Sequence, residues 1–350
     1  MANTQGPTEA SASPAVPGKA MPPAPSRGDR LRSVALSKEM GITLLLIVLS
    51  ALTTWYSHGI FLSQENLHNQ ANLIGMYGIF SIGAGIVIIT SGIDLTVGSM
   101  IALLGVLLAM MLTEWHWPWP IAVLTILAGG GLLGLIHGLL ITRVNLQPFI
   151  VTLCGLLLYR GAARFIAQDE TKGFGDATGF HRLQDTATGN LFGLPFAFVL
   201  LLVIAIIMAV VLHRSVYGRY LYAIGRNEEA ARFSGINTKR IISSAYVLAA
   251  ILTAISAILF AFYTNSISPS SHGNFYELYG IAAAVLGGCS LRGGEGSIFG
   301  ILIGTALLQV LHNLVNLLGI PSSLDFAVMG AVILIGVTAD QLLRKRRRQA

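Results

Sequence analysis

Long runs of apolar residues, separated by short polar stretches, constrain this chain more than any other feature. A helix that crosses the hydrocarbon core of a bilayer needs about 20 such residues. The candidate spans are Lys38–Tyr56, Ala71–Thr90, Thr96–Leu112, Trp119–Leu140, Leu146–Ile166, Pro195–Leu212, Ile241–Tyr263, Tyr279–Leu291, Ile298–Leu318 and Leu324–Asp340. Only 11% of the residues are charged, against about 25% in soluble domains. The pattern predicts an all-α polytopic membrane protein with about ten transmembrane or partly spanning helices.

The eighth segment, Tyr279–Leu291, is short and contains adjacent glycines, so we expect it to be tilted, bent or re-entrant. The positions of the 22 basic residues test the topology. If the N-terminus is cytoplasmic and every segment crosses, only Arg160, Arg164, Lys172 and Arg182 fall outside. Positively charged loops favour the cytoplasm. The sequence therefore predicts both termini inside, and it attributes the net charge of +6 to these loops and tails rather than to nucleic-acid binding.

Polar stretches divide the chain further. Residues 1–37 are rich in proline, alanine and serine and are expected to form a disordered cytoplasmic tail. Residues 38–343 form the transmembrane domain, with a cytoplasmic loop at 213–240 and an outer loop at 167–194, and residues 344–350 form a basic cytoplasmic tail. Cys154 and Cys289 lie in or beside apolar segments, so we expect neither a disulfide framework nor a metal site.

The cytoplasmic loop contains a charged stretch that predicts a short exposed helix. Asn227 can cap its first turn. Glu228 and Glu229 then lie at the positive end of the helix dipole, and Gly235 can end the helix in a left-handed conformation. Such a helix can be presented to a soluble partner. We expect one face, which includes Glu228 and Ala231, to point into the cytoplasm.

Two glycine-containing turns interrupt the apolar segments. Asp94 and Gly98 lie in Ser91–Ser99, and two interpretations stay open for the carboxylate: a hydrated or capping group at a cytoplasmic turn, or a group with a role in transport. The second turn contains Gly287, Gly288, Arg292, Gly293 and Gly294. It either packs glycines against a neighbouring helix or forms a moving turn that contacts a partner. No phosphate-binding GxxxxGK[ST] pattern occurs in the chain.

A polar stripe marks one face of a late helix. Gln309, His312, Asn313 and Asn316 are spaced to share that face, and Asn72 lies near the outer mouth of the second span. The stripe either bonds to other helices or lines a path for a hydroxyl-rich solute. The sequence contains neither HExxH nor GxSxG, so we expect no catalytic residues and no enzyme activity.

Three motifs resemble one family of membrane proteins. Ser91–Ser99 is similar to its SGGIDLSVGS-type signature with one glycine fewer, and Ala223–Ile236 is similar to its GxNxxAAxxSGI segment. Residues 283–296 resemble its late glycine motif. The family comprises the permease subunits of bacterial ABC importers for monosaccharides of the ribose, xylose, galactose and arabinose type. The resemblance covers residues from about 40 to 340.

This resemblance implies a function and a set of partners. The chain would form a pore in the bacterial inner membrane as a homodimer, or with a paralogous permease. Two ATPase subunits would hold ATP and magnesium, leaving no cofactor in this chain, and a periplasmic sugar-binding protein would dock outside. The coupling segment would include Gly225, Asn227, Glu228, Glu229, Ala230, Ala231 and Gly235. Related permeases carry autoinducer-2 or, more distantly, branched-chain amino acids, and a stand-alone carrier with a proton relay through Asp94 or His312 is a further alternative.

Overall fold

The computed structural model describes residues 38–175 and 177–321, with isolated positions at 324, 327, 328, 330, 331, 334 and 338. The two tails, 1–37 and 344–350, lie outside the described residues. So does most of the last predicted span, Leu324–Asp340.

Helices account for every predicted span before residue 320. The spanning and partly spanning helices are α2 (Lys38–Tyr56), α3 (Gln64–Ile89), α4 (Val97–Thr113), α5 (Trp119–Thr142), α6 (Pro148–Ile166), α8 (Phe196–Arg214), α11 (Thr238–Thr264), α12 (Tyr276–Leu286) and α13 (Ile298–Leu317). Six of them, α3, α5, α6, α8, α11 and α13, are long and apolar enough to cross a membrane, counting only described residues. The predicted all-α polytopic membrane protein is confirmed.

Short elements fill the connections. They are the 3-10 turn η1 (Ile60–Leu62) and the helices α7 (His181–Thr188), α9 (Val216–Arg226) and α10 (Glu228–Phe233). The strands are β1 (Lys172–Gly173), β2 (Asn190–Leu191), β3 (Leu194–Pro195) and β4 (Ser266–Ile267); β1 pairs antiparallel with β4, and β2 with β3. The loop 167–194, which the sequence places outside, therefore contains short elements of its own, and Lys172 Nζ ties it to the end of α4 through an ion pair with Glu114 at 2.9 Å.

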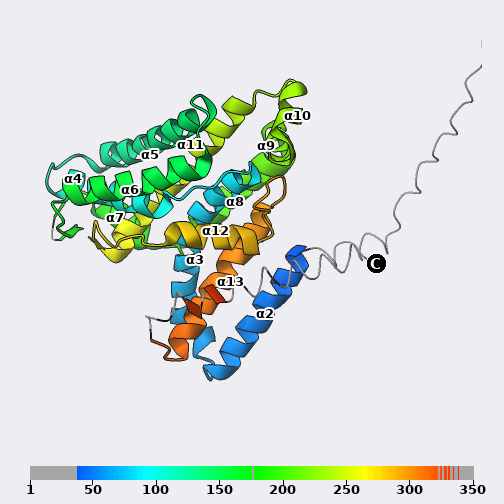
Figure 1. Ribbon diagram of the computed structural model, residues 1–350. Coiled ribbons are helices and arrows are strands. Elements are labelled where there is room, and N and C mark those ends of the chain that lie inside the picture. The colour runs from blue at the N-terminus through cyan, green and yellow to red at the C-terminus, as the bar shows by residue number, and fades with distance from the viewer. Residues whose placement is uncertain are drawn as a thin grey trace, which may run out of the picture. The chain divides into compact units, whose positions relative to one another are not determined.

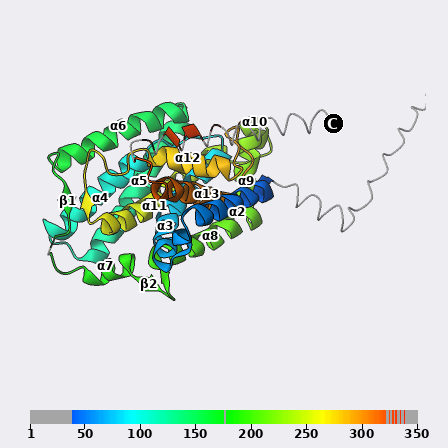
Figure 2. The same cartoon turned by 90° about the horizontal axis from the view of Figure 1, so that it is seen from below.

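Helices α3, α4 and α11 form the centre, and nearly every residue of α4 is buried. In the most apolar stretch of α3 and of α11, 78% of the residues are buried, against 33%, 28% and 33% in α5, α6 and α8. The peripheral helices expose large apolar side chains, including Leu124, Leu157 and Ile206, which lipid rather than water can solvate. Figures 1 and 2 both show α2 running beside α13. The face of α2 that points away from the other helices is also apolar and exposed.

A stripe of glycines lets α5 approach α11. Gly130, Gly134 and Gly138 recur every fourth residue, as in small-residue interfaces between membrane helices. A β-carbon at Gly134 would lie 2.9 Å from Val247 Cα, and one at Gly138 would lie 2.6 Å from Ser243 Cα. Ser243 Oγ donates to Gly138 O at 3.0 Å, which adds a hydrogen bond at this close contact.

We expect Gly134→Ala to destabilise the protein by about 1–3 kcal/mol, because the added methyl overpacks a backbone contact. Gly131→Ala is the matched control, since its β-carbon would meet Ile251 Cγ1 at an ordinary 3.5 Å. Alanine also favours helix over glycine by up to about 1 kcal/mol. Thermal unfolding in detergent should lower the Tm of the first variant only. Equal melting of both variants would contradict this packing.

The eighth predicted span, which we expected to be tilted, bent or re-entrant, is only partly helical. Helix α12 has 11 residues and rises only about 16 Å, roughly half of the hydrocarbon core. Tyr263 Oη, near the end of α11, donates to Asn69 Oδ1 near the start of α3 at 3.1 Å. The turn after α12 reaches the other end of α3, where Gly294 N donates to Ile89 O at 2.9 Å. The chain therefore runs the length of α3 between these points.

Irregular backbone covers the part of the crossing that α12 does not. Between β4 and α12, the carbonyls of Pro269 and His272 accept from Arg160 Nη1 at 3.1 and 2.7 Å. Gly273, at a φ of 71°, lies against the backbone of Gly98. Non-helical backbone at membrane depth is tolerated where protein satisfies its polar groups. An apolar run too short to span alone thus belongs to a segment that crosses.

Candidate functional site

The cytoplasmic loop predicted from the charged stretch contains two consecutive helices. Asn227 lies between α9 and α10, and its Oδ1 accepts from Ala230 N at 2.9 Å. Gly235 follows α10 at a φ of 85°, so the predicted caps are both present. Helix α9 was not predicted; the signal was Ser215, whose Oγ accepts from Gly218 N at 3.1 Å as an N-cap.

The expected orientation of α10 is wrong at one position. Ala231 is only 4% exposed and packs in a cluster with Ile224 and Ile236 rather than pointing outward. Because α10 has only six residues, one side must hold it to the rest of the loop. Glu228, Glu229, Ala230, Arg232 and Phe233 are exposed. The outward surface therefore combines two carboxylates with an aromatic ring, Phe233, that is 84% exposed.

Figure 1 shows α9 and α10 at one end of the helices, beside the turn that follows α12. There the three sequence motifs meet in a contact that we call the motif junction, formed by Ile89, Ser91, Gly225, Arg292 and Gly294. Ser91 Oγ lies 3.1 Å from Gly225 O and 3.0 Å from Arg292 O. Gly294 N donates to Ile89 O at 2.9 Å. Segments more than a hundred residues apart are thereby joined at the base of α10.

The junction requires glycine at several positions. A β-carbon on Gly225 would collide with Ile89 O and Gly294 N, which are both backbone atoms. Gly293 and Gly294 have φ values of 80° and 70°, which favour glycine. Tyr222 Oη adds a hydrogen bond to Gly296 O at 2.7 Å. The sequence identified the glycines of both motifs but did not predict that they touch.

The glycines directly after α12, together with one on α13, have a different role. A β-carbon on Gly287 would collide with Gly300 O, and one on Gly304 with Ala283 O. These contacts bring α12 and α13 together. Gly288 has a φ of 95° and allows the turn that follows α12. Of the two interpretations of this turn, packing therefore describes Gly287, whereas Gly293 and Gly294 belong to the junction.

Asp94 is buried rather than hydrated. Its side chain Oδ1 accepts from Thr96 N at 2.9 Å and from Thr96 Oγ1 at 2.6 Å, at the start of α4. The residue is 3% exposed, so the hydrated alternative is wrong and the carboxylate shapes the entry to the helix. A second polar pair lies close by: His137 Nε2 and Tyr159 Oη are 2.7 Å apart, and Gly155 lies against His137 and Thr96.

Gly98, which also belongs to the Ser91–Ser99 motif, lies where α4 meets α12. A β-carbon there would collide with Gly273 O and lie 2.5 Å from Glu277 Oε2. Glu277 is itself 8% exposed. The Ser91–Ser99 motif thus connects two regions: Ser91 reaches the motif junction, and Gly98 supports the irregular half of the crossing.

Two members of the polar stripe on α13, Gln309 and Asn313, form hydrogen bonds to other helices. Gln309 Oε1 accepts from Tyr279 Oη of α12 at 3.3 Å, and Asn313 Nδ2 donates to Asn66 Oδ1 of α3 at 2.8 Å. His312 and Asn72 are half-buried, and Asn316 is exposed. Asn66 was missed by the sequence analysis, although it lies in the polar first turns of α3. Gln309 and Asn313 therefore hold helices together.

Comparison with known proteins adds to this geometry. Residues 66–337 match the family described as the permease component of a branched-chain amino acid transport system. The ribose import permease protein of Bacillus subtilis (strain 168) is 38% identical over 306 residues, which cover 86% of this chain and 91% of that protein. The Escherichia coli (strain K12) ribose import permease protein is 36% identical, covering 89% and 97%. The fructose import permease protein of Rhizobium meliloti is 31% identical, covering 90% and 89%.

The apolar helices and the family match together define a multi-pass membrane permease. The chain belongs to the family of transport-system permease components that matches residues 66–337. No solved structure matches it.

Proposed function

We propose that this chain is the transmembrane permease subunit of an ATP-driven ABC importer that carries a monosaccharide, with ribose as the first candidate. The observation that carries the proposal is the similarity to ribose import permeases along nearly the whole length of both chains. The similar fructose permease belongs to the same substrate class. These relatives do not favour autoinducer-2, another small polar solute or a stand-alone carrier.

In this proposal α10 docks on an ATPase subunit that holds ATP and magnesium. The exposed Glu228, Glu229 and Ala230 make the contact, while Asn227 and Gly235 set the ends of the helix. Ala231 and Gly225 anchor it to the membrane domain. Movement of α10 reaches α3 and the turn after α12 through the motif junction. ATP and the loaded receptor then each bias one state of the same two-state pore, which is what coupling requires.

The remaining partners follow from the same proposal. Both termini are cytoplasmic in this proposal, which places the motif junction on the cytoplasmic side, facing the ATPase. The outer loop 167–194 then lies on the opposite side and faces a periplasmic sugar-binding protein. The hydrogen bond to Glu114 raises the pKa of Lys172 above its usual value, so this lysine under the outer loop keeps its charge to a higher pH than a free lysine would. The pore is a homodimer or a pair with a paralogous permease. Asn72, His312 and Asn316 line the sugar path, with Gln309 and Asn313 fixing the helices beside it.

Isolation of the tagged full-length chain from native membranes tests this function. We expect a P-loop ATPase and a periplasmic binding protein to co-purify, and the ligand of that receptor then names the sugar. Uptake into proteoliposomes should require all of these components and ATP. Recovery of the chain alone, with ATP-independent uptake, would contradict the proposal and indicate a secondary carrier.

A further inference from the structure

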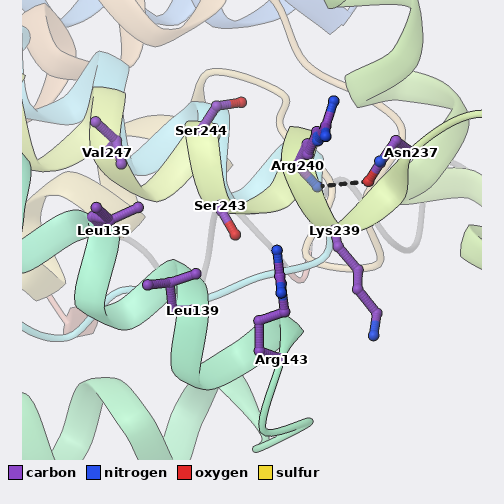
Figure 3. A pocket seen from close by; sticks show the side chains of 9 residues that line it. All are labelled: Leu135, Leu139, Arg143, Asn237, Lys239, Arg240, Ser243, Ser244 and Val247. Carbon is purple, nitrogen blue, oxygen red and sulfur yellow. Dashed lines mark hydrogen bonds between the residues drawn. The ribbon is translucent and has the colours of Figure 1, made fainter.

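A cavity of about 550 Å³ lies between the end of α5 and the start of α11. Leu135, Leu139 and Arg143 line it from α5, and Lys239, Ser243 and Val247 line it from α11. Figure 3 shows Arg143 pointing from the end of α5 toward the first turn of α11, and Lys239 pointing from that turn toward the end of α5. The two cations therefore border the same opening.

The charged end of this cavity has no acidic partner among the residues that the structure describes. Arg143, Lys239 and the adjacent Arg240 are exposed, and none of them forms an ion pair within the part of the chain that the structure describes. The N-terminus of α11, a helix of 27 residues, adds the positive end of its dipole. Asn237 Oδ1 accepts from Arg240 N at 3.1 Å and so occupies one free amide. The site favours an anion.

The other end of the cavity is apolar and open to lipid. Leu135 and Leu139 are each 40% exposed, and Leu132 on the preceding turn is 58% exposed. These side chains continue the lipid-facing surface of α5, whereas a small inorganic anion would leave them uncovered. Ser243 does not offer a free hydroxyl, because it donates to Gly138 O. A ligand that satisfies both ends carries a negative headgroup on an apolar tail.

We propose that this cavity binds an anionic phospholipid, with its phosphate between Arg143 and Lys239 and an acyl chain along Leu135 and Leu139. Basic pockets between helices at the membrane surface are suited to such headgroups. Since α5 and α11 meet here at the base of the α10 loop, the lipid joins the two helices where they leave the membrane. Only the assignment to the cytoplasmic leaflet rests on the proposed function.

Native mass spectrometry of the purified full-length chain in detergent tests this site. Phosphatidylglycerol is titrated against phosphatidylcholine, and inorganic phosphate is added as a competitor. A basic residue near the headgroup contributes about fivefold in affinity. We expect tighter first binding of phosphatidylglycerol, and Arg143→Gln with Lys239→Gln should weaken it by about 25-fold. The control, Arg214→Gln with Arg219→Gln, removes the same charge from exposed positions on α8 and α9 and should bind like the wild type.

Hydrogen exchange gives a second measurement that needs no variant. Residues 237–244 should exchange more slowly in nanodiscs of phosphatidylglycerol than in nanodiscs of phosphatidylcholine. Equal affinity for the two lipids, an unchanged double variant or unchanged exchange would overturn the proposal. Displacement of the lipid by millimolar phosphate would identify a site for a free anion instead and would also overturn it. Because these readouts measure binding alone, a failure of the importer function would not change them.

Discussion

Gly225→Val is expected to abolish sugar uptake while the chain stays in the membrane and keeps its helices. A side chain at this position collides with Ile89 O and Gly294 N, which are backbone atoms that cannot rotate away. The hydrogen bond between these two atoms and the contact of Ser91 with Gly225 O would be lost together. The change therefore separates the α10 loop from α3 and from the turn after α12. ATPase activity should lose its response to the loaded receptor.

The measurement is uptake and receptor-stimulated ATPase activity in proteoliposomes that contain the co-purified components. Gly161→Val is the control, because it adds the same isopropyl side chain and a β-carbon at Gly161 meets nothing within 4 Å. We expect near-wild-type uptake from this control and a Tm close to that of the wild type. Full uptake by the Gly225 variant would contradict the proposed role of the motif junction in coupling.

The sequence predicted what depends on local patterns. Apolar runs predicted the helices, and Asn227 and Gly235 predicted the limits of α10, because capping is decided within a few residues. It also selected the glycine motifs. It did not predict that Ser91, Gly225 and Gly294 touch, since such contacts depend on how distant helices pack. From a single sequence, a glycine required by a turn looks the same as one required by a contact.

Two further differences between the sequence-based expectation and the structure also arise from packing between distant segments. Ala231 was expected to face the cytoplasm because it lies in the predicted cytoplasmic loop, yet the small side chain is buried and lets α10 lie close to Ile224. The residues before α12 carry no helical pattern, but Arg160 satisfies their carbonyls from another helix. Hydropathy measures the length of an apolar run and is insensitive to a crossing made partly of irregular backbone.

Reversing the charge at both Glu228 and Glu229 is expected to release the ATPase subunit and to stop uptake. The two carboxylates are exposed on α10 and face the proposed partner. Truncating a desolvated charged contact at an interface costs about 2–5 kcal/mol, so affinity should fall on the order of a hundredfold or more. Arginine at the N-terminus of α10 also costs up to about 1 kcal/mol through the helix dipole.

A graded set of variants separates docking from folding of the loop. Glu228→Gln with Glu229→Gln removes the charge without opposing the dipole, and we expect it to weaken ATPase recovery less than Glu228→Arg with Glu229→Arg. Ala231→Arg differs in kind, because it forces a charge into the cluster around Ile224 and should lower the Tm as well. Co-purification measures docking of the ATPase, and thermal unfolding measures the stability of the folded loop. Wild-type recovery and uptake by the charge-reversed variant would place the ATPase contact elsewhere than on α10.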